Sequence, residues 1–178
     1  GRFLFRYDMK SGRFIYDLDI NGNLYKDGII TALEVDNDNN LWIGNNEGLA
    51  FWEASTGVLT TYTQEKGLAG NIITALFRDR KGNIWIGSDR KSGLTRYDPV
   101  EKKFTILELG QEIIPRSITE TPDGMIWVGS VAGVYCITGD TIKLNLREES
   151  GLLSNNIKLL QSDGANYLYI GTNTGLNR

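Results

Sequence analysis

The sequence predicts an all-β fold, a β-propeller built of four-stranded antiparallel blades, and three observations lead to this prediction. An apolar–aromatic–apolar–glycine tetrapeptide recurs four times, at intervals of 42 to 43 residues. A turn rich in Asp, Asn and Gly precedes each copy, and no segment shows helical periodicity. Four short strands in a period of this length are typical of a propeller blade. The copies are Leu-Trp-Ile-Gly at 41–44, Ile-Trp-Ile-Gly at 84–87, Ile-Trp-Val-Gly at 126–129 and Leu-Tyr-Ile-Gly at 168–171.

The period that starts near residue 67 shows how each strand is predicted. Residues 72–77 are mostly apolar, as expected of a first strand that lines a central channel and is covered on both sides. Residues 79–83 contain Asp, Gly and Asn, which suit a tight hairpin turn. The second strand follows at 84–87 and the third at 94–98. A fourth strand comes after another polar turn, as residues 58–62 do one period earlier.

The aromatic residue of each repeat is expected to be structural. A single four-stranded blade has two apolar faces, so it must stack against its neighbours. We therefore expect Trp42, Trp85 and Trp127 to fill the space between blades. Cys136 is the only cysteine, which excludes an internal disulfide, and we expect it to be buried in a strand.

Both ends of the chain have the same phase in the repeat. Arg-Tyr-Asp at 6–8 aligns with Arg-Tyr-Asp at 96–98, so the chain is expected to begin in the third strand of a blade. One interpretation is that the ends pair in a composite blade and close a small ring. The favoured interpretation is a fragment of a larger ring. The predicted division of the single domain 1–178 is a half blade at 1–24 with strands three and four, blades at 25–66, 67–110 and 111–150, and a partial blade at 151–178.

Composition excludes several classes of function. The net charge is −3, with 19 basic and 22 acidic residues, so no basic surface for nucleic acid is predicted. Histidine is absent, which excludes Ser-His-Asp and Cys-His nucleophiles and His-based zinc sites. Residues 36–40 superficially resemble a calcium loop, but Leu41 stands where that loop needs glycine. We therefore predict no catalytic residue, no metal site and no cofactor.

Residues 67–73, 79–87 and 93–98 together resemble the two-component regulator propeller repeat. Gly-Leu-Leu-Ser-Asn-Asn-Ile at 151–157 is an even closer match to the start of that repeat. The resemblance covers nearly the whole chain. It is weaker at 26–28 and 108–111, which lack the usual entry motif, and at Tyr169, which replaces Trp.

The resemblance implies a seven-bladed ring on the periplasmic side of a bacterial hybrid two-component histidine kinase, anchored in the inner membrane. It implies a non-catalytic sensor that responds to a glycan or oligosaccharide. The expected partners are an oligosaccharide or other small ligand, and the remaining blades and downstream signalling domains of the parent chain. No nucleic acid contact by this segment is expected.

Loops between second and third strands are the expected ligand face. The loop after Gly87 is two residues longer than its three equivalents and carries Asp89, Arg90 and Lys91. The guanidinium of Arg90 is suited to bind the carboxylate of a uronate or a sulfate group. The equivalent loops supply weaker candidates, namely Asn45, Asn46, Glu47 and Asn173.

Two other functions remain as alternatives. The blades can serve as a scaffold for protein–protein interaction, including a homodimer, because fold does not settle function. A propeller lyase similar to the streptogramin lyases is less favoured, because those enzymes use catalytic histidines and this chain has none.

Overall fold

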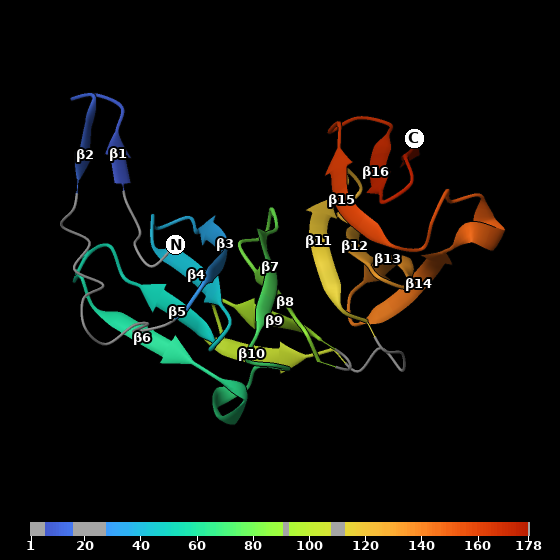
Figure 1. Ribbon diagram of the computed structural model, residues 1–178. Coiled ribbons are helices and arrows are strands. Elements are labelled where there is room, and N and C mark those ends of the chain that lie inside the picture. Colours follow the sequence, from blue (N-terminus) through green and yellow to red (C-terminus); the bar gives the residue numbers. More distant parts are fainter. Residues whose placement is uncertain (1–5, 16–27, 91–92, 108–112, 178) are drawn as a thin grey trace.

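Figure 1 shows the computed structural model of the chain, which describes residues 6–15, 28–90, 93–107 and 113–177. Within these ranges the regular structure is almost entirely β, with two single 3-10 turns, η1 (Gln64–Lys66) and η2 (Glu148–Ser150). The strands form antiparallel meanders in which consecutive strands are neighbours. The predicted all-β propeller of four-stranded blades is confirmed.

We call the four larger sheets blades 1 to 4, in chain order. Blade 1 contains β3 (Ile30–Val35), β4 (Leu41–Asn45), β5 (Leu49–Trp52) and β6 (Leu59–Tyr62). Blade 2 contains β7 (Ile73–Arg78), β8 (Ile84–Ser88), β9 (Leu94–Asp98) and β10 (Lys103–Ile106). Blade 3 contains β11 (Pro115–Glu120), β12 (Ile126–Ser130), β13 (Gly133–Thr138) and β14 (Thr141–Leu146). Blade 4 contains β15 (Ile157–Ser162), β16 (Leu168–Thr172) and β17 (Leu176–Asn177).

The blades follow one another around an arc, with their first strands β3, β7, β11 and β15 on the inner side (Figure 1). A separate hairpin is formed by β1 (Arg6–Asp8) and β2 (Arg13–Ile15). Among the described strands, neither β1 nor β2 pairs with blade 4, so the composite blade is not formed. The larger ring and the exact blade boundaries stay predictions.

The turn between the first and second strands is held by one carboxylate in blades 1 and 2. In blade 2 the buried Asp79 accepts backbone N–H groups of Lys81 and Asn83, at 3.0 and 2.8 Å. Its other oxygen accepts the Asn83 side-chain amide and Trp85 Nε1, each at 2.9 Å. Asp36 holds Trp42 in the same way in blade 1. The indole N–H groups are thereby satisfied where the rings are buried.

The tryptophans of the tetrapeptides pack between blades, as predicted. Trp42 and Trp85 are buried, and Trp127 is half-buried. Trp42 contacts Phe51 of its own blade and Tyr97 of the next, with ring centroids 4.6 and 4.8 Å apart. Each aromatic thus contributes to a cluster between blades. Cys136 is buried in β13, also as predicted.

The glycine that ends each tetrapeptide allows the next blade to approach. A methyl group at Gly44 would lie 2.5 Å from Ile73, one at Gly87 2.7 Å from Pro115, and one at Gly129 2.6 Å from Ile157. These three partners are the first residues of β7, β11 and β15. The repeat therefore needs glycine here for packing between blades rather than for a special backbone conformation.

The apolar faces at the two ends of the arc are less covered than the faces between blades. Leu49 and Leu94 are completely buried, whereas the equivalent Leu176 of blade 4 is 65% exposed. Leu160 is 5% exposed, whereas the equivalent Leu33 of blade 1 is 48% exposed. The described part of the chain contains no helix of the length and apolarity that a membrane span requires.

Candidate functional site

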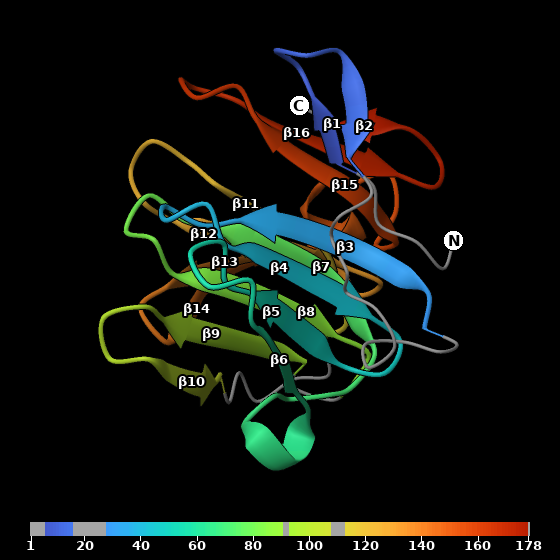
Figure 2. The same cartoon turned by 90° about the vertical axis from the view of Figure 1, so that its left-hand side faces the viewer.

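Among the described ligand residues that the sequence predicts, Asn45 is the last residue of β4, and the others lie in the β4–β5, β8–β9 and β16–β17 loops. Figure 2 shows β3 and β4 running in opposite directions, so the β3–β4 turn and the β4–β5 loop lie at opposite ends of the blade. Because all blades have the same strand order, the candidate loops share one face of the propeller. We call it the loop face, and the end formed by the first-to-second strand turns the turn face.

Asn45 has a structural position in its loop. Its side chain is completely buried, and Oδ1 accepts the N–H groups of Glu47 and Gly48, both at 2.7 Å. Ser130 occupies the same repeat position in blade 3, where its hydroxyl donates to the Gly133 carbonyl. Asn45 Nδ2 is buried without a hydrogen-bond partner in the described part of the chain. The side chain therefore holds the turn together, and its role in ligand binding stays a prediction.

Asn46, Asp89 and Asn173 occupy one repeat position and contact the segment that enters their own blade. Asn46 Oδ1 accepts the Ile29 N–H at 2.7 Å. The backbone N–H groups of Asp89 and Asn173 donate to the carbonyls of Ile72 and Asn156, at 3.1 and 3.3 Å. The structure thus brings each candidate loop against the connection from the preceding blade, as a composite binding surface would require.

The β8–β9 loop, which is longer in the sequence than its equivalents, contributes charged residues to this surface. Arg90 is exposed and Asp89 is half-buried, while Glu47 in the equivalent loop is exposed. The Arg90 side chain passes close to Gly70, where a methyl group would lie 2.7 Å from Arg90 Cγ. Lys91, the third predicted residue of this loop, lies outside the described residues. Among the described residues, no group of three or more Cys, Asp or Glu side chains is placed to hold a metal ion.

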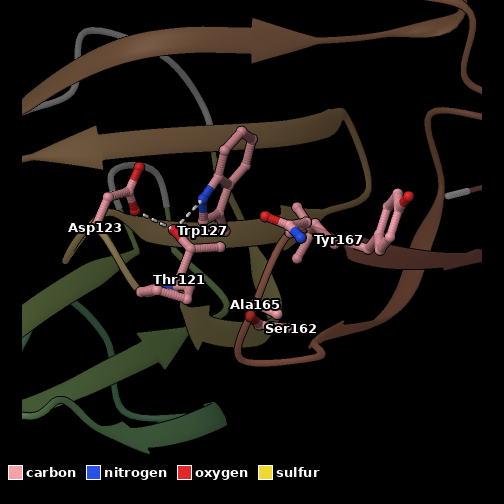
Figure 3. Close-up of a pocket in the computed structure, with 9 residues that line it drawn as sticks. Thr121, Asp123, Trp127, Ser162, Ala165 and Tyr167 are labelled. Atoms are coloured by element: carbon pink, nitrogen blue, oxygen red, sulfur yellow. Dashed lines mark hydrogen bonds between the residues drawn. The ribbon is translucent and has the colours of Figure 1, made fainter.

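A pocket of about 300 Å³ lies on the turn face, between blades 3 and 4, where the sequence analysis placed no site. Figure 3 shows Thr121, Asp123 and Trp127 on the blade 3 side, and Ser162, Ala165 and Tyr167 on the blade 4 side. Pro122, Asn166 and Leu168 complete the lining. The two halves are more than 30 residues apart in the sequence, so no local motif reveals the pocket.

A chain of hydrogen bonds fixes the blade 3 side of this pocket. Trp127 Nε1 donates to the Thr121 hydroxyl at 3.0 Å, and that hydroxyl donates to Asp123 Oδ1 at 2.6 Å (Figure 3). The bond from Thr121, with a second from the Met125 N–H, lowers the pKa of the Asp123 carboxyl. The pocket therefore contains a carboxylate that is ionised at neutral pH and held in one position.

Two segments of the chain, residues 24–47 and 67–90, match the family model described as two component regulator propeller. Each match extends to the second-to-third strand loop of its blade. These two segments are therefore similar to the two-component regulator propeller repeat. The resemblance seen in the sequence is thereby confirmed for the propeller repeat. No curated protein matches the sequence.

Solved structures give the same fold. The extracellular domain of a putative hybrid two component system from B. thetaiotaomicron is 25% identical, with a TM-score of 0.73, over 85% of this chain and 21% of that one. PorZ, a surface component of the type-IX secretion system of Porphyromonas gingivalis, is 20% identical, with a TM-score of 0.70, over 97% of this chain and 28% of PorZ.

A lyase is also among the structural neighbours. A catalytically inactive histidine-to-alanine variant of virginiamycin B lyase from Staphylococcus aureus is 18% identical, with a TM-score of 0.66, over 85% of this chain and 55% of the lyase. At this identity the likeness shows the fold alone. The chain spans between 21% and 55% of the lengths of these three proteins.

Proposed function

We propose that this chain is a non-catalytic propeller segment that senses a ligand for a two-component regulator, outside the cytoplasm and, in a bacterium with two membranes, in the periplasm. The observation that supports this most is the match to the two component regulator propeller model together with the 25% identity to the extracellular domain of a putative hybrid two component system. A histidine kinase, in this proposal, belongs to other parts of the parent protein.

An oligosaccharide is the proposed ligand, with the loop face as its binding surface. The exposed guanidinium of Arg90, beside Asp89, suits the carboxylate of a uronate or a sulfate ester. Glu47 adds a carboxylate acceptor and Asn173 adds an amide, each from the equivalent loop of another blade. Polar groups of this kind recognise hydroxyl-rich ligands by hydrogen bonds.

Isothermal titration of the full chain against neutral and acidic oligosaccharides tests the proposal. We expect an acidic oligosaccharide to bind, and Arg90→Ala to weaken that binding by about tenfold, the loss typical of one charged hydrogen bond. Arg13→Ala is the matched control, because Arg13 is also exposed but lies on β2. Chemical conversion of any oligosaccharide would contradict the non-catalytic assignment.

A further inference from the structure

The junctions between neighbouring blades differ at the turn face. Between blades 1 and 2, the Arg78 guanidinium donates to the Asn37 side-chain carbonyl. A methyl group at Gly82 would lie 3.0 Å from Asn37 Nδ2, so the two turns are in close contact. The first junction is therefore filled by side chains.

The junction between blades 2 and 3 is bridged by a single arginine, Arg80, whose side chain is 57% exposed. The Arg80 guanidinium donates to the carbonyls of Thr121 and Pro122, the latter at 3.1 Å. The Arg80 N–H and Nε contact Glu120 Oε2 at 2.9 and 3.2 Å. Arg80 thus crosses from one turn to the next and occupies the space between them.

In blade 3 the repeat position of Arg80 is occupied by Pro122. Proline has no donor and no charge, and its ring is too short to cross to the next turn. The space that Arg80 fills at the preceding junction is therefore left open at this one. The result is the pocket of about 300 Å³ between the β11–β12 and β15–β16 turns.

The pocket has the chemistry of an amphipathic, hydroxyl-rich ligand site. Trp127 supplies half-buried aromatic surface from blade 3, and the 45% exposed Tyr167 lies on the blade 4 side with its ring directed away from Trp127 (Figure 3). Asp123 supplies an ionised acceptor, and Asn166 an exposed amide that both donates and accepts. A pyranose ring has apolar C–H faces and a rim of hydroxyl groups, which match aromatic surface and polar groups respectively.

We propose that this pocket, which we call the Trp127–Tyr167 pocket, is a saccharide subsite that holds one pyranose unit of an oligosaccharide. The sugar ring packs against Trp127, a sugar hydroxyl donates to Asp123, and Tyr167 borders the blade 4 side of the subsite. The pocket is open to solvent, so a longer glycan extends out of it along the groove between blades. This inference rests on the proposed sensing function, but it places a second contact on the face opposite Arg90.

Saturation-transfer NMR of the full chain with maltotetraose, cellotetraose, mannotetraose and trigalacturonate tests the subsite. Two variants alter its surface, namely Tyr167→Ala and Asp123→Asn. A third, Pro122→Arg, restores the side chain that fills the neighbouring junction. Matched controls are Tyr7→Ala, which removes another half-exposed tyrosine, and Asp98→Asn, which neutralises another carboxylate of lowered pKa.

We expect at least one oligosaccharide to bind the unaltered chain, and all three pocket variants to weaken its binding by at least about tenfold while both controls bind normally. The circular dichroism of Pro122→Arg should be unchanged, because Pro122 is exposed. Binding that survives Pro122→Arg overturns the subsite. If that binding is lost in Arg90→Ala, the proposed function still stands. Absence of binding by the whole panel, or preferential binding of choline, a cation that aromatic and acidic groups also attract, overturns the saccharide assignment.

Discussion

Each tetrapeptide ends in a glycine, and alanine substitutions at these four glycines test why glycine is required there. The requirement can come from packing against the next blade or from the backbone of the strand that carries the glycine. A methyl group at Gly129 would lie 2.6 Å from Ile157 Cγ2 and 3.1 Å from Leu160 Cγ, both in the next blade. At Gly171 the nearest atom, the Leu159 carbonyl oxygen, would be 3.6 Å away, which is ordinary van der Waals contact. Neither glycine has a positive φ, so alanine suits the backbone at both positions.

Overpacking a filled interface costs about 1–3 kcal/mol, and we expect Gly129→Ala to fall in this range because both atoms belong to buried side chains. For a chain of this size, that loss lowers the midpoint of thermal unfolding by about 2–12 °C. Gly171→Ala should change the free energy of unfolding by no more than about 0.5 kcal/mol. It should, if anything, stabilise the chain, since alanine restricts the unfolded state.

Thermal and urea unfolding followed by tryptophan fluorescence measures the difference, with circular dichroism to establish that both variants keep their β structure. Gly44→Ala and Gly87→Ala should behave like Gly129→Ala, since their methyl groups would lie 2.5 and 2.7 Å from the next blade. Equal losses at Gly129 and Gly171 would refute the reasoning, because they would show that the strand, rather than the junction, requires glycine.

Three further predictions concern single side chains. Asp79→Ala should lower the free energy of unfolding in urea by about 2–4 kcal/mol, because it leaves the buried Trp85 indole N–H and the turn without their acceptor; Asp79→Asn should recover part of this loss. The hydrogen bond from the Glu101 N–H lowers the pKa of the Asp98 carboxyl. The ionised Asp98 carboxylate therefore stabilises the folded chain above its unfolded-state pKa, and this stabilisation is lost as the pH falls through its folded-state pKa. Thermal unfolding of Asp98→Asn should accordingly depend less on pH below about pH 4 than that of the unaltered chain. Cys136 is 1% exposed, and burial raises the pKa of its thiol. Its reaction with a thiol reagent at pH 8 should therefore follow the rate of unfolding. Fast labelling of the native chain would contradict this prediction.

The blade architecture was predictable because the residues that build it recur at a constant interval. The third strand of blade 2 was predicted at 94–98 and is observed as Leu94–Asp98. The predicted second strand at 84–87 continues one residue further, to Ser88, whose hydroxyl bonds to the Gly93 carbonyl. The spacing of six residues between Asp79 and Trp85 is also visible in the sequence. Its meaning required the structure, because only the folded turn brings the carboxylate to the indole.

The candidate site was less predictable, because the polar contacts of its residues differ from one blade to the next. Asn45 looks like an exposed loop residue in the sequence, yet it is buried because its side chain forms the turn that follows β4. Arg80 looks like an ordinary polar turn residue, yet its guanidinium contacts residues about 40 positions away in the next blade. Equivalent positions of the repeat can therefore have different surroundings, depending on which side chains the neighbouring turn presents.

A repeat protein of this kind gains specificity where its repeats differ. The backbone of each blade is set by residues that recur, such as the glycines at 44, 87 and 129, and these leave little freedom for function. The features that vary include the second residue of each turn, which is Asn37, Arg80, Pro122 or Gly164, and the greater length of the loop after Gly87. Arg80 closes one junction, whereas Pro122 opens the next into a pocket lined by aromatic and acidic groups. Exchange of one side chain at this position therefore changes which groups two neighbouring turns present at their junction, without any change in fold.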